Sequence, residues 1–499
     1  MTTIQNIAQL LLAPHLAARP DKTAFIQGER KLTYRQLCEG AYRFAHWLQA
    51  EGVPAGARVA IVLPDSFALI QSFFGGILAG VVPVLGNSAA SADDIGFLLQ
   101  DVESTLLLAP PESVAAKAAQ GAPRAVRLLP VESDQTFEQL LAAHPASASV
   151  FEPEQDDIAF MLYTSGSTGE AKGVPHRHSA LLFSIETLGK RLFQITENDT
   201  VFVTSKLSFV FGVVCNIVLP VNVGASAMLM PDQPTPEILL QLILRHRPTV
   251  LMSVPSLYNL MLKAMTNSKQ LHGLRLCVSA GEALPASIAA EWHDTNGVAL
   301  MDCIGSTETL NAYIVNRISP DGSTSFGSVV PPFEARLANA NGQPVVRGEA
   351  GELQLRGGSI APYYWNRPEI TAETMLAGGW LRTGDIYIER DGGYVHQGRT
   401  NDLFKVDAQW VSPTLIENAL RTHPAVHESA VVGRLVADMM RPWAFVVLAP
   451  GFAPGGELIA ELREHVGAQL QRFMVPVRFV FMDALPKTST GKVQRLKLP

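Results

Sequence analysis

Residues 158–173 read IAFMLYTSGSTGEAKG and join an uncharged apolar run to a loop of glycines, hydroxyl residues and a single lysine. The run at 158–163 has the length and composition of a buried strand. The stretch 163–173 then holds three glycines, four serine or threonine hydroxyls and Lys172. It therefore offers free backbone N–H groups, neutral donors and one mobile cation. A loop of this kind directly behind a buried strand predicts a phosphate-binding site.

The spacing of this loop separates it from the common mononucleotide-binding loop. Its pattern is G-x-x-G-x-x-K-G, and Gly173 follows Lys172. A Walker loop has four residues between its glycines and a Ser or Thr after the lysine, so P-loop kinases and motor ATPases are disfavoured. The alternative is a flexible surface linker, but linkers rarely follow a buried strand or lead into another apolar segment.

Length and composition indicate a globular protein with more than one domain. The chain has 499 residues, more than a single core usually holds, and hydrophobic residues make up 47% against 17% charged. Acidic residues exceed basic ones by seven (46 minus 39), and no block of Lys or Arg stands out. A nucleic-acid partner is therefore not expected, and an anionic substrate would be met by local cations.

The cysteines and the apolar stretches favour a reducing, cytoplasmic setting. No C-x-x-C spacing occurs among the four cysteines, which argues against a disulfide framework and a zinc site. Residues 1–12 lack the features of a secretory signal. Residues 67–86 and 209–230 are uncharged, but their internal glycines, prolines and asparagines favour helix-then-strand units over membrane spans.

Strand and helix patterns alternate along most of the chain. Residues 22–85 alternate β-rich and helical runs as βαβ units do, and Thr33 with Gln36 predicts a capping box. Residues 114–153, rich in Ala, Pro and Ser, are expected to be surface elaboration. A second series places strands at 200–204, 226–230, 250–254 and 274–279. This spacing predicts largely parallel sheets covered by helices on both faces.

The predicted fold class is α/β, with a boundary near Asn401. Residues 1–400 are predicted to form a large N-terminal domain of stacked, mostly parallel sheets with helices. Denser glycines and prolines at about 322–398 indicate a small antiparallel, barrel-like subdomain within it. Residues 401–499, with a helix capped by Ser412, have the size of an independent α+β domain.

Further short motifs carry residues suited to nucleotide chemistry. Glu308, after small hydroxyl residues, can hold a hard divalent cation beside phosphate oxygens. Asp385 can accept both ribose hydroxyls, and Arg399 can reach ribose and phosphate with its planar fork. Each motif alone also has a purely structural explanation. Residues 279–285 could be an ordinary turn, Glu308 a surface acid, Asp385 and Arg399 an ion pair, and residues 486–493 a flexible basic tail. The motifs are SAGEALP at 279–285, IGSTE at 304–308, WLRTGD at 380–385 with Gly398 and Arg399, and PKTSTGKV at 486–493.

Together with the loop at 163–173, and in this chain order, these motifs resemble the adenylate-forming superfamily of acyl-CoA synthetases, peptide-synthetase adenylation domains and luciferases. The resemblance covers nearly the whole chain. It implies that a carboxylate attacks the α-phosphorus of MgATP to give acyl-AMP and pyrophosphate. The acyl group then passes to the thiol of CoA or of a carrier-protein pantetheine.

The resemblance also implies a role for each matching residue. Lys172, Mg²⁺ held by Glu308, and Lys492 are expected to stabilise the charge that develops during adenylation, so these are the catalytic residues. Glu308 is the metal ligand. ATP or AMP is expected to contact Thr164, Ser165, Gly166, Ser167, Thr168, Gly169, Lys172, Gly281, Glu282, Asp302, Cys303, Ile304, Gly305, Ser306, Thr307, Asp385, Arg399 and Lys492.

Within the superfamily the chain looks most like benzoate-type aryl-CoA ligases, through SKLSFVFG at 205–212, VSAGEALP at 278–285 and IGSTE at 304–308. Phe209 and Phe211 would flank a flat ring, with core packing as the alternative. Asn311 stands where benzoate-type enzymes tend to have His, which leaves a substituted benzoate or an acid of another shape open. The residues expected around the acid are Phe209, Phe211, Gly212, Ser279, Ala280 and Asn311.

Two alternatives remain open: a ligase for a medium-chain or arylalkanoic acid, and an adenylating module that loads a carrier protein. In the family the small C-terminal domain is mobile and swings about the position held here by Asn401. Where the family usually has glycine beside the thiol tunnel, this chain has Asp407 and Ala408. A slow thioester step is therefore expected. The acid, the acceptor, a homodimeric state and the pathway stay open at this point.

Overall fold

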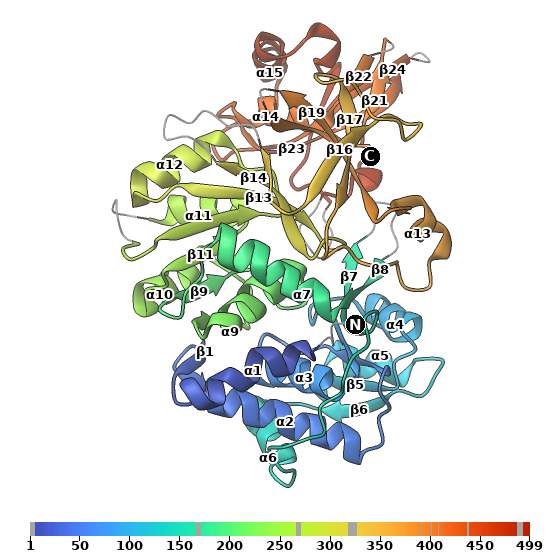
Figure 1. Ribbon diagram of the computed structural model, residues 1–499. Helices are drawn as coiled ribbons and strands as arrows, with labels where there is room; N and C mark the ends of the chain where they lie inside the picture. Colours follow the sequence, from blue (N-terminus) through green and yellow to red (C-terminus); the bar gives the residue numbers. More distant parts are fainter. Residues whose placement is uncertain are drawn as a thin grey trace. The chain divides into compact units, whose positions relative to one another are not determined.

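The computed structural model describes residues 5–165, 171–265, 271–317, 327–390, 392–400, 402–407, 409–436, 439–486 and 493–499. The chain divides into two compact units, whose elements Figure 1 labels. Unit 1 holds Met1–Glu334 and Arg356–Leu381, and unit 2 holds Ala335–Leu355 and Arg382–Pro499. The domain boundary near residue 401 remains a prediction.

A six-stranded sheet of unit 1 carries the predicted phosphate loop. Its order is β6-β5-β3-β4-β7-β8, parallel except for β8. Helices α4 and α5 pack on the sheet through apolar side chains such as Leu99 and Leu107, and α3, buried along its length, lies between the sheet and α2 (Figure 1). The bounds are β3 (Arg58–Ile61), β4 (Val82–Leu85), β5 (Leu106–Ala109), β6 (Arg127–Pro130), β7 (Ile158–Ser165), β8 (Ala171–Arg177), α2 (Tyr34–Ala50), α3 (Phe67–Leu78), α4 (Ala92–Asp101), α5 (Val114–Gln120) and α6 (Asp134–Leu141).

A nine-stranded sheet forms the rest of the framework of unit 1. Its order is β15-β14-β13-β12-β11-β9-β10-β1-β2, with β2, β14 and β15 antiparallel to their neighbours. Tyr258 and Trp292 pack edge to face in the core under α10, α11 and α12. The strands are β1 (Thr23–Gln27), β2 (Arg30–Thr33), β9 (Thr200–Val203), β10 (Ser226–Met228), β11 (Val250–Ser253), β12 (Leu276–Ala280), β13 (Leu300–Ser306), β14 (Asn311–Arg317) and β15 (Ser328–Val329).

Two helical stretches beside this sheet contain π-helical segments. The first runs from α7 into η1, and the second from α8 through η2 into α9. Such segments are rare and frequently occur at functional sites. The helical bounds are α1 (Ile7–Ala18), α7 (His178–Ser184), η1 (Ile185–Leu192), α8 (Val210–Gly212), η2 (Val213–Val218), α9 (Leu219–Val223), α10 (Pro236–His246), α11 (Pro255–Ala264), α12 (Ala286–Asn296) and α13 (Pro368–Thr374).

The strands from β16 onward form the barrel-like part and two smaller sheets, one of which is the pair β21-β22. A five-stranded sheet has the order β16-β17-β19-β18, with β20 paired to β19, and β23-β24-β25 form a second sheet over α14 and α15. Arg495 holds both carboxylate oxygens of Glu417 at 2.8 and 2.9 Å. The bounds are β16 (Glu334–Ala338), β17 (Ala350–Arg356), β18 (Met375–Leu376), β19 (Trp380–Arg390), β20 (Gly393–Arg399), β21 (Phe404–Val406), β22 (Gln409–Val411), α14 (Pro413–Arg421), β23 (Val426–Val436), β24 (Met439–Leu448), α15 (Gly456–Gln469), η3 (Arg472–Met474), β25 (Arg478–Phe481) and η4 (Arg495–Lys497).

The α/β class is confirmed, and so are the two predicted caps. Thr33 and Gln36 form the capping box at α2, and Ser412 caps α14. Residues 67–86 form α3 and then β4, and residues 209–230 form helical turns and then β10. Among the described residues, no helix is long and apolar enough to span a membrane.

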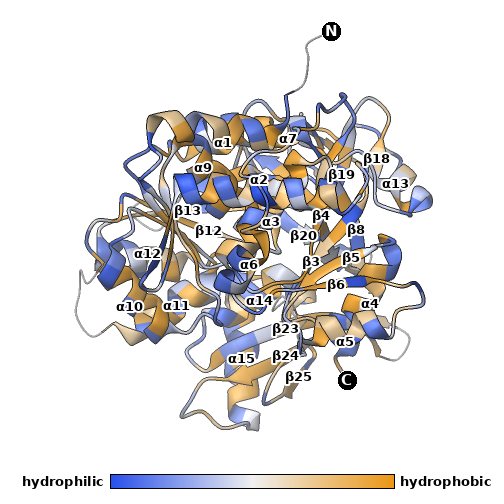
Figure 2. Ribbon diagram, turned by 90° about the horizontal axis from the view of Figure 1, so that it is seen from below, coloured by the Kyte–Doolittle hydropathy of each residue, from blue (hydrophilic) through white to orange (hydrophobic). Residues whose placement is uncertain are grey.

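Two predictions about the first 153 residues are wrong. β1 and β3 do not belong to one βαβ series, because β1 joins the nine-stranded sheet and pairs with the unpredicted, mostly polar strand β2. Residues 114–153 are not mere surface elaboration: β6 extends the six-stranded sheet, and Phe137 and Leu141 on the inner face of α6 are buried. In Figure 2 the outer sides of α2 and α6 are hydrophilic, so only their inner faces belong to the core.

Candidate functional site

The base of the phosphate loop is fixed by strand pairing. Thr164 of β7 pairs with Lys172 of β8, which places this lysine on a strand where the loop closes. The Tyr163 hydroxyl donates to the Asp101 carboxylate at 2.6 Å, and Arg367 donates to the same carboxylate at 3.1 Å. Burial and this hydrogen bond raise the pKa of Tyr163. Gly166, Ser167, Thr168 and Gly169 lie outside the described residues, as does the side chain of Ser165.

Two of the predicted catalytic residues meet at a third side chain. Glu308 lies in the turn between β13 and β14, and its Oε1 accepts the Tyr364 hydroxyl at 2.7 Å. The backbone N–H of Ala361 donates to the Glu308 carbonyl at 2.7 Å. Lys172 Nζ lies 5.3 Å from the centroid of the Tyr364 ring, close enough for a cation–π contact. Tyr364 therefore joins the loop lysine to the predicted metal ligand, a role that the sequence patterns did not indicate.

The residues around Glu308 suit a hard cation that a nucleotide completes. No group of three or more His, Cys, Asp or Glu side chains gathers within the part of the chain that the structure describes. Mg²⁺ commonly binds through one or two carboxylates and takes its other ligands from phosphates and water. A single carboxylate beside a phosphate loop, with one oxygen already oriented by a hydroxyl, fits that pattern.

The turn that carries Glu308 is held by its own hydroxyl groups. Ser306 N–H donates to Thr309 Oγ1 at 3.2 Å, and that hydroxyl donates to the Asn311 carbonyl at 2.8 Å. A Cβ at Gly305 would lie 2.5 Å from the same carbonyl, so glycine alone fits this position. Cys303 is buried and burial raises its thiol pKa, which leaves only its backbone suited to contact a nucleotide.

The other predicted nucleotide and acid residues of unit 1 lie at the ends of β12 and β13. Asp302 accepts from Asn316 at 3.0 Å, and Glu282 accepts from the Ser256 hydroxyl at 3.2 Å. Gly281 has a φ of +88°, which favours glycine. The Ser279 hydroxyl is buried and has no hydrogen-bond partner among the described residues. The carboxyl ends of neighbouring parallel strands are where α/β sheets bind ligands.

The segment 205–212, predicted to line the acid site, is held in place by hydrogen bonds and close packing. Leu207 N–H donates to the buried Asp65 carboxylate at 3.0 Å, and burial raises the pKa of Asp65 to about 6. Lys206 Nζ donates to the carbonyls of residues 230, 231 and 232 at 2.6, 3.0 and 2.5 Å. A Cβ at Gly212 would lie 2.2 Å from the Lys206 carbonyl. Phe209 and Phe211, in contrast to core aromatics, are only half-buried.

Asn311 opens β14 and lies in a buried polar cluster. Its Nδ2 lies 2.6 Å from Thr187 Oγ1 and 3.5 Å from Ser184 Oγ. Leu310 just before it is fully buried and has a φ of +50°, a conformation that leucine rarely adopts. The sequence indicated Asn311, whereas Ser184 and Thr187 looked like ordinary helix residues.

The remaining predicted residues belong to unit 2 or lie outside the described parts. Asp385 and Arg399 face each other in the β19–β20 ladder, and Arg399 Nε lies 3.3 Å from Asp385 Oδ1. Asp407 has a φ of +50° and pairs with Arg441 at 2.9 Å. A positive φ therefore falls on an ion-paired aspartate, one position before Ala408. Asn401, Ala408 and Lys492 lie outside the described residues.

Comparison with known proteins gives the same family over almost the whole chain. The model for AMP-binding enzymes matches residues 12–365, and the model for their C-terminal domain matches residues 415–492. The chain is 37% identical over 492 residues to a benzoate–CoA ligase of Thauera aromatica, covering 97% of this chain and 93% of that protein. It is 38% identical over 491 residues to a 4-hydroxybenzoate–CoA/benzoate–CoA ligase of Rhodopseudomonas palustris, covering 96% and 91%.

Among solved structures, the anthranilate CoA ligase AuaEII in complex with anthranoyl-AMP superposes with a TM-score of 0.92 at 32% identity, covering 100% of this chain and 97% of that one. The names of these relatives differ in the ring substituents of the acid. The chain belongs to the AMP-binding enzyme family, as an AMP-forming acid–CoA ligase of the aryl-CoA ligase group.

Proposed function

We propose that this protein joins a small benzoate-type acid to CoA in two steps at the expense of ATP. In the first step a carboxylate oxygen attacks the α-phosphorus of ATP, the bond to the β-phosphate oxygen breaks, and pyrophosphate leaves. In the second step the thiol sulfur of CoA attacks the acyl carbon of the adenylate, the thiol proton passes to solvent, and AMP leaves. Adenylation is needed because a free carboxylate is a poor electrophile.

The observation that carries this proposal is the meeting of Lys172 and Glu308 at Tyr364. A cation and a carboxylate at the mouth of a phosphate loop suit a triphosphate with its metal ion. Mg²⁺ bound at Glu308 would neutralise charge on the phosphate oxygens. Lys172 would contact the phosphates as a point charge. Lys492 is proposed to bridge the acid and the α-phosphate in the first step, and Asp385 and Arg399 to hold the ribose and phosphate.

The clamped segment 205–212 supports an aromatic acid as the substrate. Its backbone is anchored by Asp65 and Lys206, so Phe209 and Phe211 are presented by a rigid segment. Half-buried rings on a rigid segment can take a flat ring by offset or edge contacts. Full-length similarity to ligases for benzoate and its derivatives supports the same class.

The test is a panel of acids assayed for pyrophosphate release, with and without CoA. Benzoate, its hydroxy and amino derivatives, phenylacetate, cinnamate and octanoate cover the aromatic and the alternative classes. We expect a benzoate to give the highest kcat/KM and an acyl-CoA product. Preference for octanoate or phenylacetate would contradict the acid class. Acyl-AMP that forms but passes only to a pantetheine carrier protein would contradict CoA as the acceptor. Lys172→Ala and Glu308→Gln serve as inactive controls.

A further inference from the structure

A buried group of three polar side chains, Ser184, Thr187 and Asn311, lies beside the predicted acid site. Ser184 and Thr187 come from α7 and η1, and Asn311 is the first residue of β14. All three are buried, and Asn311 is 5% exposed. Polar groups this deep in a protein are normally hydrogen-bonded, so a partner is expected for each of their atoms.

The hydrogen bonds fix which way the Asn311 carboxamide points. The Thr187 hydroxyl donates to the Phe183 carbonyl at 2.8 Å, and the Ser184 hydroxyl donates to the Leu310 carbonyl at 3.0 Å. A carbonyl can only accept, so the single proton of each hydroxyl is already used. Both hydroxyl oxygens therefore face Asn311 as acceptors, and only its amide nitrogen can lie between them. The amide orientation follows from the network itself.

The carboxamide oxygen consequently points away from both hydroxyls. Oδ1 of Asn311 is buried and has no hydrogen-bond partner among the described residues. An unpaired buried acceptor is unfavourable, and proteins seldom keep one without a reason. The neighbouring Leu310 is held at a φ of +50°, and backbone strain of this kind clusters at ligand sites. The unpaired oxygen thus points to an absent hydrogen-bond donor, and the strained backbone beside it fits a ligand site.

The cluster adjoins the elements predicted to surround the acid. Asn311 follows Glu308 by three residues and pairs with Ser306 across the β13–β14 hairpin. The segment η2 continues directly from Phe211 and Gly212 and contacts α7, which carries Ser184. The unpaired oxygen therefore belongs to the same part of unit 1 as the aromatic side chains.

We propose that the preferred acid carries a hydrogen-bond donor on its ring, a hydroxyl or a primary amine, and that Asn311 Oδ1 accepts from it. This inference rests on the proposed function, because it needs an aromatic acid in the site. Oδ1 can only accept, so an unsubstituted, methyl, fluoro or methoxy ring leaves it unpaired. A site built to hydrogen-bond a substrate group rejects analogues that lack it, much more strongly than an apolar pocket rejects an extra group. Hydroxy- and aminobenzoates are thereby favoured over benzoate.

The test compares isosteric pairs with the wild-type enzyme. The kcat/KM for adenylation is measured for 2-, 3- and 4-hydroxy- and aminobenzoates against the fluoro and methyl analogues at the same ring position. At one of the three ring positions we expect kcat/KM for the donor-bearing acid to exceed that of its analogues by about 10- to 100-fold. Analogues that match or exceed every donor-bearing acid would overturn the inference. If no aromatic acid is adenylated at all, the proposed function fails instead.

A variant assigns the effect to Asn311. Asn311→Leu removes the acceptor at similar volume, so the donor-bearing acid should lose its advantage over benzoate through a higher KM. Asn216 offers a matched control, since it is buried, its Nδ2 donates to the Met228 carbonyl at 2.8 Å, and its Oδ1 is also unpaired among the described residues. Asn216→Leu should leave the preference unchanged. The assignment is contradicted if the preference survives in folded Asn311→Leu, or if Asn216→Leu loses it equally. If either variant fails to fold, the comparison of acids with the wild-type enzyme decides the question.

Discussion

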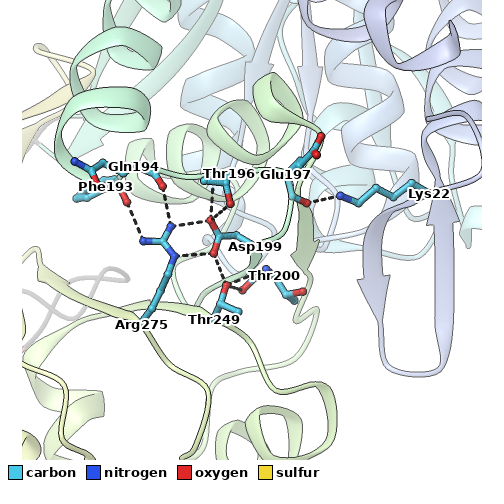
Figure 3. Close-up of polar contacts among 9 residues, drawn as sticks. All are labelled: Lys22, Phe193, Gln194, Thr196, Glu197, Asp199, Thr200, Thr249 and Arg275. Carbon is cyan, nitrogen blue, oxygen red and sulfur yellow. Dashed lines mark hydrogen bonds and ion pairs between the residues drawn. The ribbon is translucent and has the colours of Figure 1, made fainter. Parts of the chain in front are cut away.

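The buried carboxylate of Asp199 stabilises the fold, and the structure allows the size of its contribution to be worked out (Figure 3). Its carboxylate is 4% exposed and accepts from Arg275 Nε and Nη2, each at 2.7 Å. It also accepts from the Thr249 hydroxyl at 2.6 Å and from Thr196 N–H at 2.7 Å. Asp199, Thr249 and Arg275 precede β9, β11 and β12, so the network ties together the starts of three neighbouring strands.

The pKa of Asp199 gives the size of this contribution to stability. Burial alone would raise it, but the hydrogen bonds from Arg275, Thr249 and Thr196 outweigh burial and lower it from 3.8 to about 2. At about 1.4 kcal/mol per pKa unit, the ionised form contributes roughly 2–3 kcal/mol to folding at neutral pH. Because the folded pKa is the lower one, this stability is present above about pH 4 and is lost as the pH falls toward 2.

Asp199→Asn keeps the shape of the side chain and removes its charge. We expect unit 1 to lose about 2–3 kcal/mol of stability at pH 7, seen by calorimetry as a fall of several degrees in its Tm. The difference from wild type should be constant between pH 8 and 5 and narrow below pH 4. Glu197→Gln is the control: Lys22 donates to the backbone carbonyl of Glu197, which the change keeps, and the exposed Glu197 side chain forms only a surface ion pair with Arg19, worth under about 1 kcal/mol. Equal Tm values for Asp199→Asn and wild type at pH 7 would refute the reasoning.

Four further predictions concern the reaction. Lys492→Ala should slow acyl-AMP formation by about 10²-fold or more, yet spare transfer from supplied acyl-AMP to CoA; wild-type exchange of pyrophosphate into ATP would contradict this role. Phe209→Ala or Phe211→Ala should raise KM for the acid far more than KM for ATP, whereas equal changes would indicate a folding role. Tyr364→Phe keeps the ring beside Lys172 but removes the hydroxyl that orients Glu308. Half-maximal exchange of pyrophosphate into ATP should then need more Mg²⁺, while metal-free ATP binding, measured by calorimetry, stays unchanged. An unaltered Mg²⁺ dependence would contradict the positioning role. Ala408→Gly should speed transfer to CoA in stopped-flow assays without altering pyrophosphate exchange, and rapid wild-type transfer unaffected by the change would show that no glycine is needed.

Local signals in the sequence predicted the elements well. The apolar run at β7, the cap at Thr33 and the strand repeats after residue 200 each depend on neighbouring residues, so they can be read without knowing the fold. Sheet membership is different. The alternation of strand and helix near β1 and β3 is the same whether the two strands share a sheet or not, and only the pairing of β1 with β10, two hundred residues away, decides it.

In the candidate site, too, residues within local motifs could be predicted, whereas residues brought in by packing could not. Glu308 and Lys172 were indicated by their motifs, but Tyr364 lies 56 residues after Glu308 and has no local signature. Thr187 donates to a carbonyl one helical turn earlier, as such residues commonly do, and the contacts of Ser184 and Thr187 with Asn311 form only when β14 packs against them. Contacts between distant segments, and the positive φ of Leu310, are products of packing that no short pattern carries.

The route of the oxygen atoms tests the central claim most directly. The best acid of the panel, labelled with ¹⁸O in its carboxylate, is turned over with ATP and CoA, and the products are analysed by mass spectrometry. Attack of the carboxylate on the α-phosphorus predicts one ¹⁸O atom in AMP, none in pyrophosphate, and one retained in the acyl-CoA carbonyl. Label in inorganic phosphate with ADP as the nucleotide product, or AMP without label, would contradict adenylation by this protein.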